Sequence, residues 1–84
     1  MIDRIQAILR EHGRLPADAK LGEDTDLYDA GMSSHATVNV MLALEGEFDV
    51  EFPDRMLRRG VFQSIASIRA ALEELEAERV KVAG

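Results

Sequence analysis

The sequence predicts an all-α fold: a small bundle of three main helices and one short helix, with a long loop between the first two main helices. Residues 2–12, 34–48 and 64–79 each place apolar side chains at helical spacing. Glycine and proline interrupt the two stretches between them, and neither strand-like alternation nor an internal repeat is present. We expect residues 1–84 to form a single domain whose tail frays at about 80–84.

The composition favours a folded, acidic protein. Hydrophobic residues make up 46% of the chain, which is too many for a disordered segment. The formal net charge of −6 argues against nucleic acid as a partner, because nucleic-acid binding needs a basic surface. The same charge favours protein partners with basic docking surfaces. With neither a signal-peptide pattern nor a membrane-spanning apolar run, we expect a cytoplasmic chain that binds no membrane.

The first helix, predicted over residues 2–12, carries one apolar stripe and is followed by Gly13, which favours a helix end. The stripe consists of Ile2, Ile5, Ile8 and Leu9. The connection over residues 13–32 is long for so small a domain, and such loops are often functional. We expect four apolar side chains to pin it to the core: Leu15, Leu21, Leu27 and Met32.

Acidic residues crowd the second half of this connection, namely Glu23, Asp24, Asp26 and Asp29. They lack the glycine and the spacing of an EF-hand, so we expect no calcium site. With no cysteine and only His12 and His35 as histidines, we expect no other metal site.

The second helix, predicted over residues 34–48, begins in a run of small polar residues after Gly31. Either Ser33 or Ser34 can cap its first turn, which leaves a serine hydroxyl at the positive end of the helix dipole. Its apolar arc is wider than a surface helix needs. One side holds Val38, Met41, Leu42 and Phe48, and Val40 and Leu44 extend it. Part of this arc is expected to stay exposed as a docking face, or else to pack between two helices.

Negative charge gathers at the end of this helix and beyond it, at Glu45, Glu47, Asp49 and Glu51. It opposes the helix dipole, which we interpret as a hint of function. The next connection, residues 49–63, contains a short helix predicted over 54–59 and ended by Gly60. Arg55, Arg58 and Arg59 form a basic cluster there, which either pairs with nearby acids or binds an acidic partner.

The last helix is predicted over residues 64–79, with Ser64 as its N-cap. Its core stripe consists of Ile65, Ile68, Leu72 and Leu75.

The region from Gly31 to Asp54 resembles the acyl carrier protein family, also called peptidyl carrier or thiolation domains. The run Gly31-Met32-Ser33-Ser34-His35 stands where that family has Gly-x-Asp-Ser-Leu at the start of its second helix. The helix that follows and its exit, Phe48-Asp49-Val50-Glu51-Phe52-Pro53, match the family pattern without a gap. In this ungapped frame the family's motif serine is Ser34 and not Ser33.

The resemblance implies a carrier protein and not an enzyme. In the family, a phosphopantetheinyl transferase attaches a 4′-phosphopantetheine arm from coenzyme A to the motif serine. The thiol of that arm then carries an acyl or aminoacyl group as a thioester, which a downstream acceptor enzyme receives. By resemblance, Ser34 is the attachment site, and its place at a helix N-terminus suits a phosphate.

Two departures from the family pattern narrow the resemblance. Ser33 replaces the usual aspartate, and His35 replaces the usual leucine. Together with the arginine cluster, they resemble the bacterial aminoacyl carrier proteins, which partner seryl-tRNA-synthetase-like amino acid:carrier-protein ligases. The alternatives are a carrier in fatty-acid, polyketide or nonribosomal-peptide synthesis, and an unmodified helical adaptor.

A catalytic role for Ser34 and His35 as a pair is not expected, since adjacent helical residues point about 100° apart and do not face each other. We instead expect partners of a monomeric chain to contact the second helix and its entrance. The predicted partner-binding residues are Ser33, His35, Val38, Leu42, Arg55, Met56 and Arg59.

Overall fold

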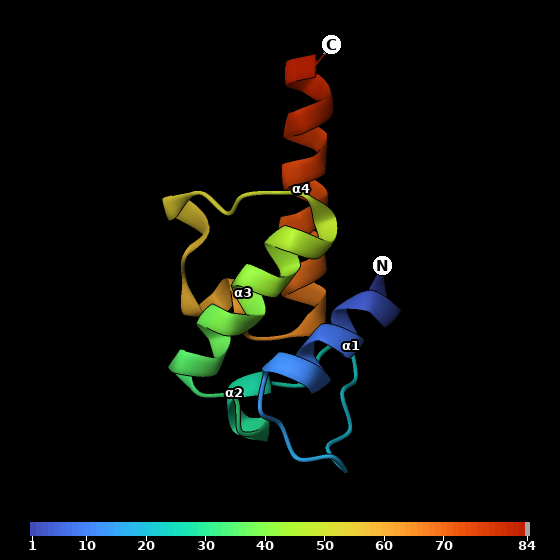
Figure 1. Cartoon of the computed structure of the whole chain (residues 1–84), viewed down its shortest axis with the longest axis vertical. Helices are drawn as coiled ribbons and strands as arrows, with labels where there is room; N and C mark the ends of the chain where they lie inside the picture. The colour runs from blue at the N-terminus through green and yellow to red at the C-terminus, as the bar shows by residue number, and fades with distance from the viewer. Residues whose placement is uncertain (84) are drawn as a thin grey trace.

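Four α-helices and two short 3-10 helices follow one another along the chain (Figure 1). The computed structural model describes the backbone of residues 1–83 and the side chains of residues 1–78. The elements are α1 (Ile2–His12), α2 (Leu27–Ala30), α3 (Ser34–Phe48), η1 (Asp54–Met56), η2 (Arg59–Phe62) and α4 (Ile65–Ala83). No strand occurs over residues 1–83, in agreement with the all-α prediction.

The first two predicted main helices, residues 2–12 and 34–48, are confirmed at both ends. The last one begins at Ile65 after a Ser64 side chain that accepts a hydrogen bond from the Ser67 N–H, as predicted. It continues to Ala83 and not to 79, because the sequence contains no helix breaker between Arg79 and Gly84. Gly84 lies outside the described residues, and fraying of the tail stays a prediction.

The connections contain more structure than the sequence predicted. A four-residue helix, α2, lies inside the expected loop, where the Asp26 carboxylate caps it by accepting from the N–H groups of Tyr28 and Asp29. The prediction of a single short helix over 54–59 is wrong. Two 3-10 helices stand there, because Leu57 leaves helical conformation with ψ 64°. Gly60 lies inside the second of them and does not end a helix.

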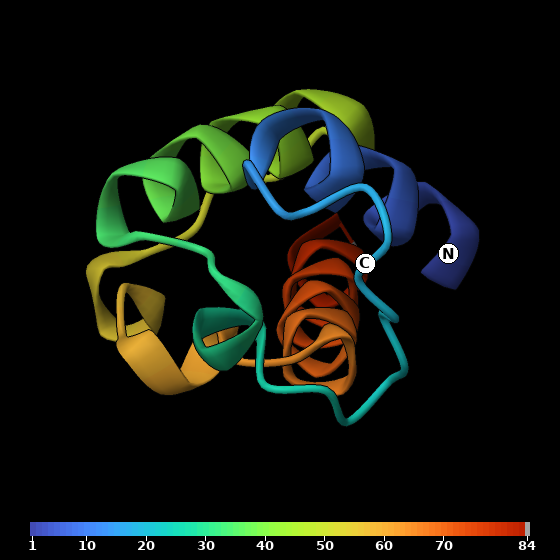
Figure 2. The same ribbon diagram turned by 90° about the horizontal axis from the view of Figure 1, so that it is seen from below.

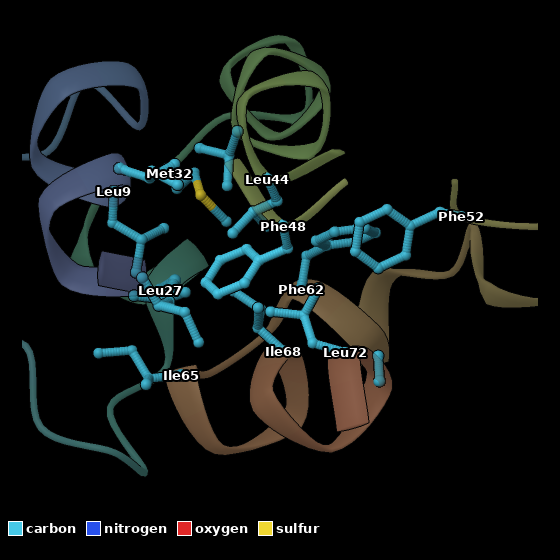
Figure 3. Packing of buried hydrophobic residues seen from close by; sticks show 14 of the residues in the cluster. Leu9, Leu27, Met32, Leu44, Phe48, Phe52, Phe62, Ile65, Ile68 and Leu72 are labelled. Atoms are coloured by element: carbon cyan, nitrogen blue, oxygen red, sulfur yellow. The ribbon is translucent and has the colours of Figure 1, made fainter. Parts of the chain in front are cut away.

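The core is formed by one face of each main helix. Figure 2 looks along α4 and shows α1 and α3 crossing it, with α2 and the 3-10 helices beside them. Helix α1 packs on both α3 and α4, and η2 packs on α4. Figure 3 shows this core in close-up, where the rings of Phe52 and Phe62 meet edge to face with centroids 5.3 Å apart.

The predicted apolar stripes of α1 and α4 are buried, except that Ile2 is only partly covered. Three of the four side chains expected to pin the loop, Leu21, Leu27 and Met32, are also buried, and Leu15 packs against the core from a partly buried position. Backbone hydrogen bonds also hold the loop on the first turn of α4 and on the residue pair just before it. The Leu27 N–H donates to the Gln63 carbonyl at 2.7 Å, and the Ala66 N–H donates to the Glu23 carbonyl at 2.9 Å.

Helix α3 buries a face that differs from the main apolar side predicted for it. Its buried residues are Ala36, Val40, Leu44 and Phe48, spaced four apart. Val38 and Leu42 retain 51% and 56% of their exposure, so part of the arc stays at the surface, as expected. The core side combines Phe48 from the predicted main side with Val40 and Leu44, which the sequence treated as an extension, because a four-residue step follows the line of contact with α1.

The acidic residues at the end of α3 have structural partners. The Glu45 carboxylate accepts from the Phe52 N–H at 2.8 Å, which ties the helix to the chain that leaves it. The Glu47 carboxylate accepts from the Arg4 guanidinium of α1 at 2.8 Å, and the same guanidinium stacks over the Phe48 ring. The position of these two acids therefore has a structural reason, contrary to the expectation that it hinted at function.

Candidate functional site

The expected attachment serine lies where a tight turn delivers the chain into α3. Helix α2 ends at Gly31, whose φ of 124° is a conformation that side-chain-bearing residues rarely adopt. Met32 then inserts into the core, and Ser33 is extended. The Ser33 Oγ accepts from the Ala36 N–H at 3.1 Å, so Ser33 is the N-cap. This answers the question that the sequence left open between the two serines.

Because Ser33 supplies the cap, the hydroxyl of Ser34 is free for another use. Ser34 is the first residue of α3 and is exposed. The Ser33 carbonyl accepts from the Thr37 N–H at 2.9 Å, while the N–H groups of Ser34 and His35 precede the first intrahelical hydrogen bond. A helix start of this kind favours a negatively charged group next to the Ser34 hydroxyl.

Ser34 also lines a groove of about 400 Å³ between α3 and the segment that contains η1 and η2. Its volume falls in the range of roughly 300–1,000 Å³ that small-molecule sites occupy. The lining combines apolar side chains with hydroxyls and two guanidinium groups. It consists of Tyr28, Ser34, Thr37, Val38, Met41, Leu57, Arg58, Arg59 and Phe62. The surroundings of Ser34 therefore offer both apolar contact and positive charge.

The three arginines of the basic cluster have different surroundings. Arg55 forms ion pairs with Glu74 and Glu78 of α4, at 3.1 Å and 2.5 Å, and the hydrogen bond to Glu74 raises the pKa of its guanidinium. Arg59 instead stacks over the Tyr28 ring, with its guanidinium carbon 4.0 Å from the ring centroid. Arg58 lies beside Arg59 in the lining of the groove. Only part of the cluster therefore belongs to the surface around Ser34.

The carboxylate of Asp26 caps α2 next to this surface and lies near Arg59. The Gln63 side-chain amide donates to it at 2.9 Å and, with the N–H groups of Asp29 and Tyr28 and the nearby charge of Arg59, lowers the pKa of Asp26. Glu23 is likewise engaged, in an ion pair with Arg69 at 2.7 Å. Over the described residues, no three His, Cys, Asp or Glu side chains gather in a way that could hold a metal ion.

Most of the predicted site residues lie at the surface around the start of α3. Ser33, Ser34, His35, Val38 and Leu42 are all exposed there. Arg59 adjoins them across the groove, whereas Arg55 is exposed but engaged with α4.

One predicted partner contact is wrong. Met56 is only 4% exposed, because η1 turns it into the core, and its neighbour Leu57 is exposed instead. Tyr28 and Leu57 also belong to this surface, although neither was predicted from the sequence. For Tyr28 the signal was the Asp26 cap followed five residues later by Gly31, which marks a short helix.

No helix in the described part of the chain is both long enough and apolar enough to cross a membrane.

Comparison with known proteins points to one family. The family model described as "Phosphopantetheine attachment site" matches residues 3–75. An aminoacyl carrier protein from Agrobacterium fabrum is 46% identical over 65 residues, which cover 76% of this chain and 78% of that protein.

Two solved structures are similar in fold. The first is that of an engineered Bradyrhizobium japonicum glycine:carrier protein ligase complexed with carrier protein from Agrobacterium tumefaciens and AMP. One of its chains gives a TM-score of 0.83 at 42% identity, over 87% of this chain and 99% of that one. A chain from the Bradyrhizobium japonicum ligase complexed with glycylated carrier protein gives a TM-score of 0.66 at 29% identity, over 82% and 97%.

Proposed function

This chain belongs to the phosphopantetheine attachment site family, and from that premise we propose that it is an aminoacyl carrier protein whose 4′-phosphopantetheine arm is attached to Ser34. The observation that supports Ser34 as the attachment site is that the two serines have different roles. Ser33 uses its hydroxyl as the helix cap, and Ser34 presents its own at the surface. Coenzyme A is the source of the arm, and a phosphopantetheinyl transferase attaches it.

The surroundings of Ser34 fit that group. In the transfer, the Ser34 Oγ forms a bond to the phosphorus nearest the pantetheine, adenosine 3′,5′-bisphosphate leaves, and the hydroxyl proton passes to a base of the transferase. The product is a phosphodiester at the start of α3, where the helix dipole and free N–H groups favour negative charge. Arg58 and Arg59 add positive charge across the groove. When bound, the arm supplies a thiol that forms a thioester with the cargo.

A separate ligase is the proposed loading enzyme, with an amino acid as cargo and a further enzyme as acceptor. This rests on carriers similar to this chain, among them one named as an aminoacyl carrier and chains solved with a glycine:carrier protein ligase. The chain itself is then a substrate and partner of enzymes. The long arm raises the effective concentration of the cargo at each partner in turn.

The ligase is expected to dock on the exposed side of α3. Val38 and Leu42 stand one turn apart there at about half exposure, with Leu57 exposed on the far side of the groove. His35 lies at the entrance of the same helix, close to the attachment point. Exposed apolar side chains next to the modified serine suit a partner that must reach the arm at its root.

Intact-protein mass spectrometry with fragmentation tests the proposal. The chain is incubated with coenzyme A and a phosphopantetheinyl transferase, then with glycine, ATP and the ligase. We expect a pantetheine adduct on Ser34, followed by an increment of one amino acid. Ser34→Ala abolishes the adduct, whereas Ser33→Ala retains it. An adduct on Ser33 contradicts the attachment site, and an adduct that accepts only acyl groups contradicts the aminoacyl cargo.

A further inference from the structure

Two arginines near Ser34 form no ion pair with a carboxylate in the described part of the chain. Arg4, Arg55 and Arg69 each pair with a glutamate, but neither Arg58 nor Arg59 forms an ion pair with a described side chain. The chain carries 16 acidic residues against 10 basic ones, so carboxylates are plentiful. A guanidinium that forms no ion pair beside a groove is therefore available to a negative group that the chain itself does not supply.

Arg59 is held in place by its neighbours. Its guanidinium lies over the Tyr28 ring at 4.0 Å from the centroid, and a stacked guanidinium keeps its edge N–H groups free. Asp26 is near enough for its charge to interact with Arg59. The oxygens of Asp26, however, already accept from Tyr28, Asp29 and Gln63. The edge of Arg59 thus remains available to another acceptor.

Arg59 and Ser34 line the same groove, from opposite sides. We propose that Arg59, with Arg58 beside it, binds the phosphodiester that joins Ser34 to its arm, and so holds the root of the arm against the groove. This inference rests on the proposed function, because it requires the modified Ser34. Arginine suits the role, since its planar fork matches the paired oxygens of a phosphate.

The arrangement makes Arg59 a positioning residue within the carrier. Sequence alone had placed it in the patch that contacts partner enzymes, and Arg55 with it. The structure separates the two, because Arg55 is paired with α4 while Arg59 lies at the groove. An exposed pair between a guanidinium and a phosphodiester is weak and screened by salt, so the arm can still leave the groove for an enzyme.

The test is phosphorus NMR on the modified protein, after mass spectrometry has verified the adduct. The variants are Arg59→Gln and, as a matched control with the same loss of charge, Arg55→Gln. We expect Arg59→Gln to narrow the ³¹P resonance of the phosphodiester and to abolish the shift of the Tyr28 ring signals that modification causes. Arg55→Gln leaves both as in the unaltered chain, and circular dichroism checks that each variant is folded.

Arg59→Lys sharpens the test, because it keeps the charge but loses the fork and the stacked plane. We expect its ³¹P linewidth to fall between those of the unaltered chain and Arg59→Gln. High salt should narrow the resonance of the unaltered chain, and narrow that of Arg59→Gln less, because Arg58 is the only arginine of the pair left there.

Two results would overturn the inference, and they are distinguishable. A normal adduct on Ser34 with the same ³¹P linewidth in the unaltered chain and Arg59→Gln overturns the role of Arg59 alone, whether or not Arg59→Gln then weakens ligase binding. The absence of any adduct on the unaltered chain overturns the attachment itself and this inference with it.

Discussion

The two ends of α3 are built for different purposes. At the C-terminal end, Phe48 is buried, Arg4 covers its ring and pairs with Glu47, and Glu45 accepts from the Phe52 N–H. At the N-terminal end, Ser34 and Val38 are exposed beside the groove. One helix of 15 residues therefore has a closed end that fixes it and an open end that presents a site.

The difference shows how a small domain places a reactive side chain without a rigid pocket around it. Val40 and Leu44 have no exposed area, while Val38 and Leu42, two residues before each of them, are about half exposed. The buried line attaches α3 to α1 and to the rest of the core, and this leaves the opposite line for partners. A site on a well-anchored helix is held more accurately than one on a loop.

The largest expected effect comes from replacing one leucine of the buried line and one leucine of the exposed line of α3 by alanine. Leu44→Ala should lower the free energy of unfolding by about 2–5 kcal/mol, because it leaves a cavity in the core. Leu42→Ala should change it by no more than about 0.5 kcal/mol, because Leu42 is largely exposed. Urea unfolding midpoints measure both. Leu42→Ala should instead slow aminoacyl loading, and similar losses of stability in the two variants would contradict the division.

The next effect concerns the closed end alone. Glu45→Ala removes the acceptor of the Phe52 N–H, and an unsatisfied, part-buried donor should cost about 1–3 kcal/mol of stability. Glu45→Gln is the matched control, since its amide oxygen can still accept that hydrogen bond. We expect the glutamine variant to lose much less stability in the same unfolding measurement. Equal losses would mean that the charge of Glu45, and not its hydrogen bond, supports the turn.

A smaller effect is expected at the open end. Ser33→Ala removes the cap of α3 and should cost about 1 kcal/mol. Ser34→Ala should leave stability almost unchanged, because the Ser34 hydroxyl is not the cap. Thermal unfolding followed by circular dichroism compares the two. A larger loss in Ser34→Ala would show that the serines have exchanged roles in solution.

The sequence predicted the helices that are long enough for the spacing of their apolar residues to repeat over several turns. Residues 2–12 and 34–48 each span at least three turns, so the spacing of their apolar residues defined them well. Helix α2 has only four residues, too few for a period, and depends on its Asp26 cap. In the segment over 54–59 the chain leaves helical geometry at Leu57, so helical spacing could not tell that Met56 is buried and Leu57 exposed.

The candidate site was predictable where it depended on local order and not where it depended on distant contacts. The position of Ser34 after Gly31 and before a long helix is a local pattern. Which arginine of the cluster is paired depends on Glu74 and Glu78, which lie 19 and 23 residues away from Arg55 along the chain. The stacking of Arg59 on Tyr28 depends likewise on the tertiary fold.

The smallest expected effect lies beneath the open end, at Asp26, and appears as a dependence on pH. The hydrogen bond from Gln63, those from Asp29 and Tyr28, and the charge of Arg59 lower the pKa of Asp26 below its ordinary value. A carboxyl group whose pKa is lower in the folded state stabilises the fold above its unfolded pKa of about 3.9, and this contribution disappears as the pH falls through the folded pKa. Asp26→Asn keeps a side-chain oxygen that can cap α2, but its amide group cannot ionise.

At neutral pH the unaltered chain should therefore be slightly more stable than Asp26→Asn, and the gap should close as the pH falls below about 4. Urea midpoints of both proteins measured from pH 7 to pH 3 would show this, because the two proteins differ only in the side chain at position 26. A gap that stays constant over that range would mean that Asp26 does not ionise differently in the folded chain. Gln63→Leu provides the direct check. Since it removes the leading cause of the shift, the NMR titration of Asp26 should move to higher pH.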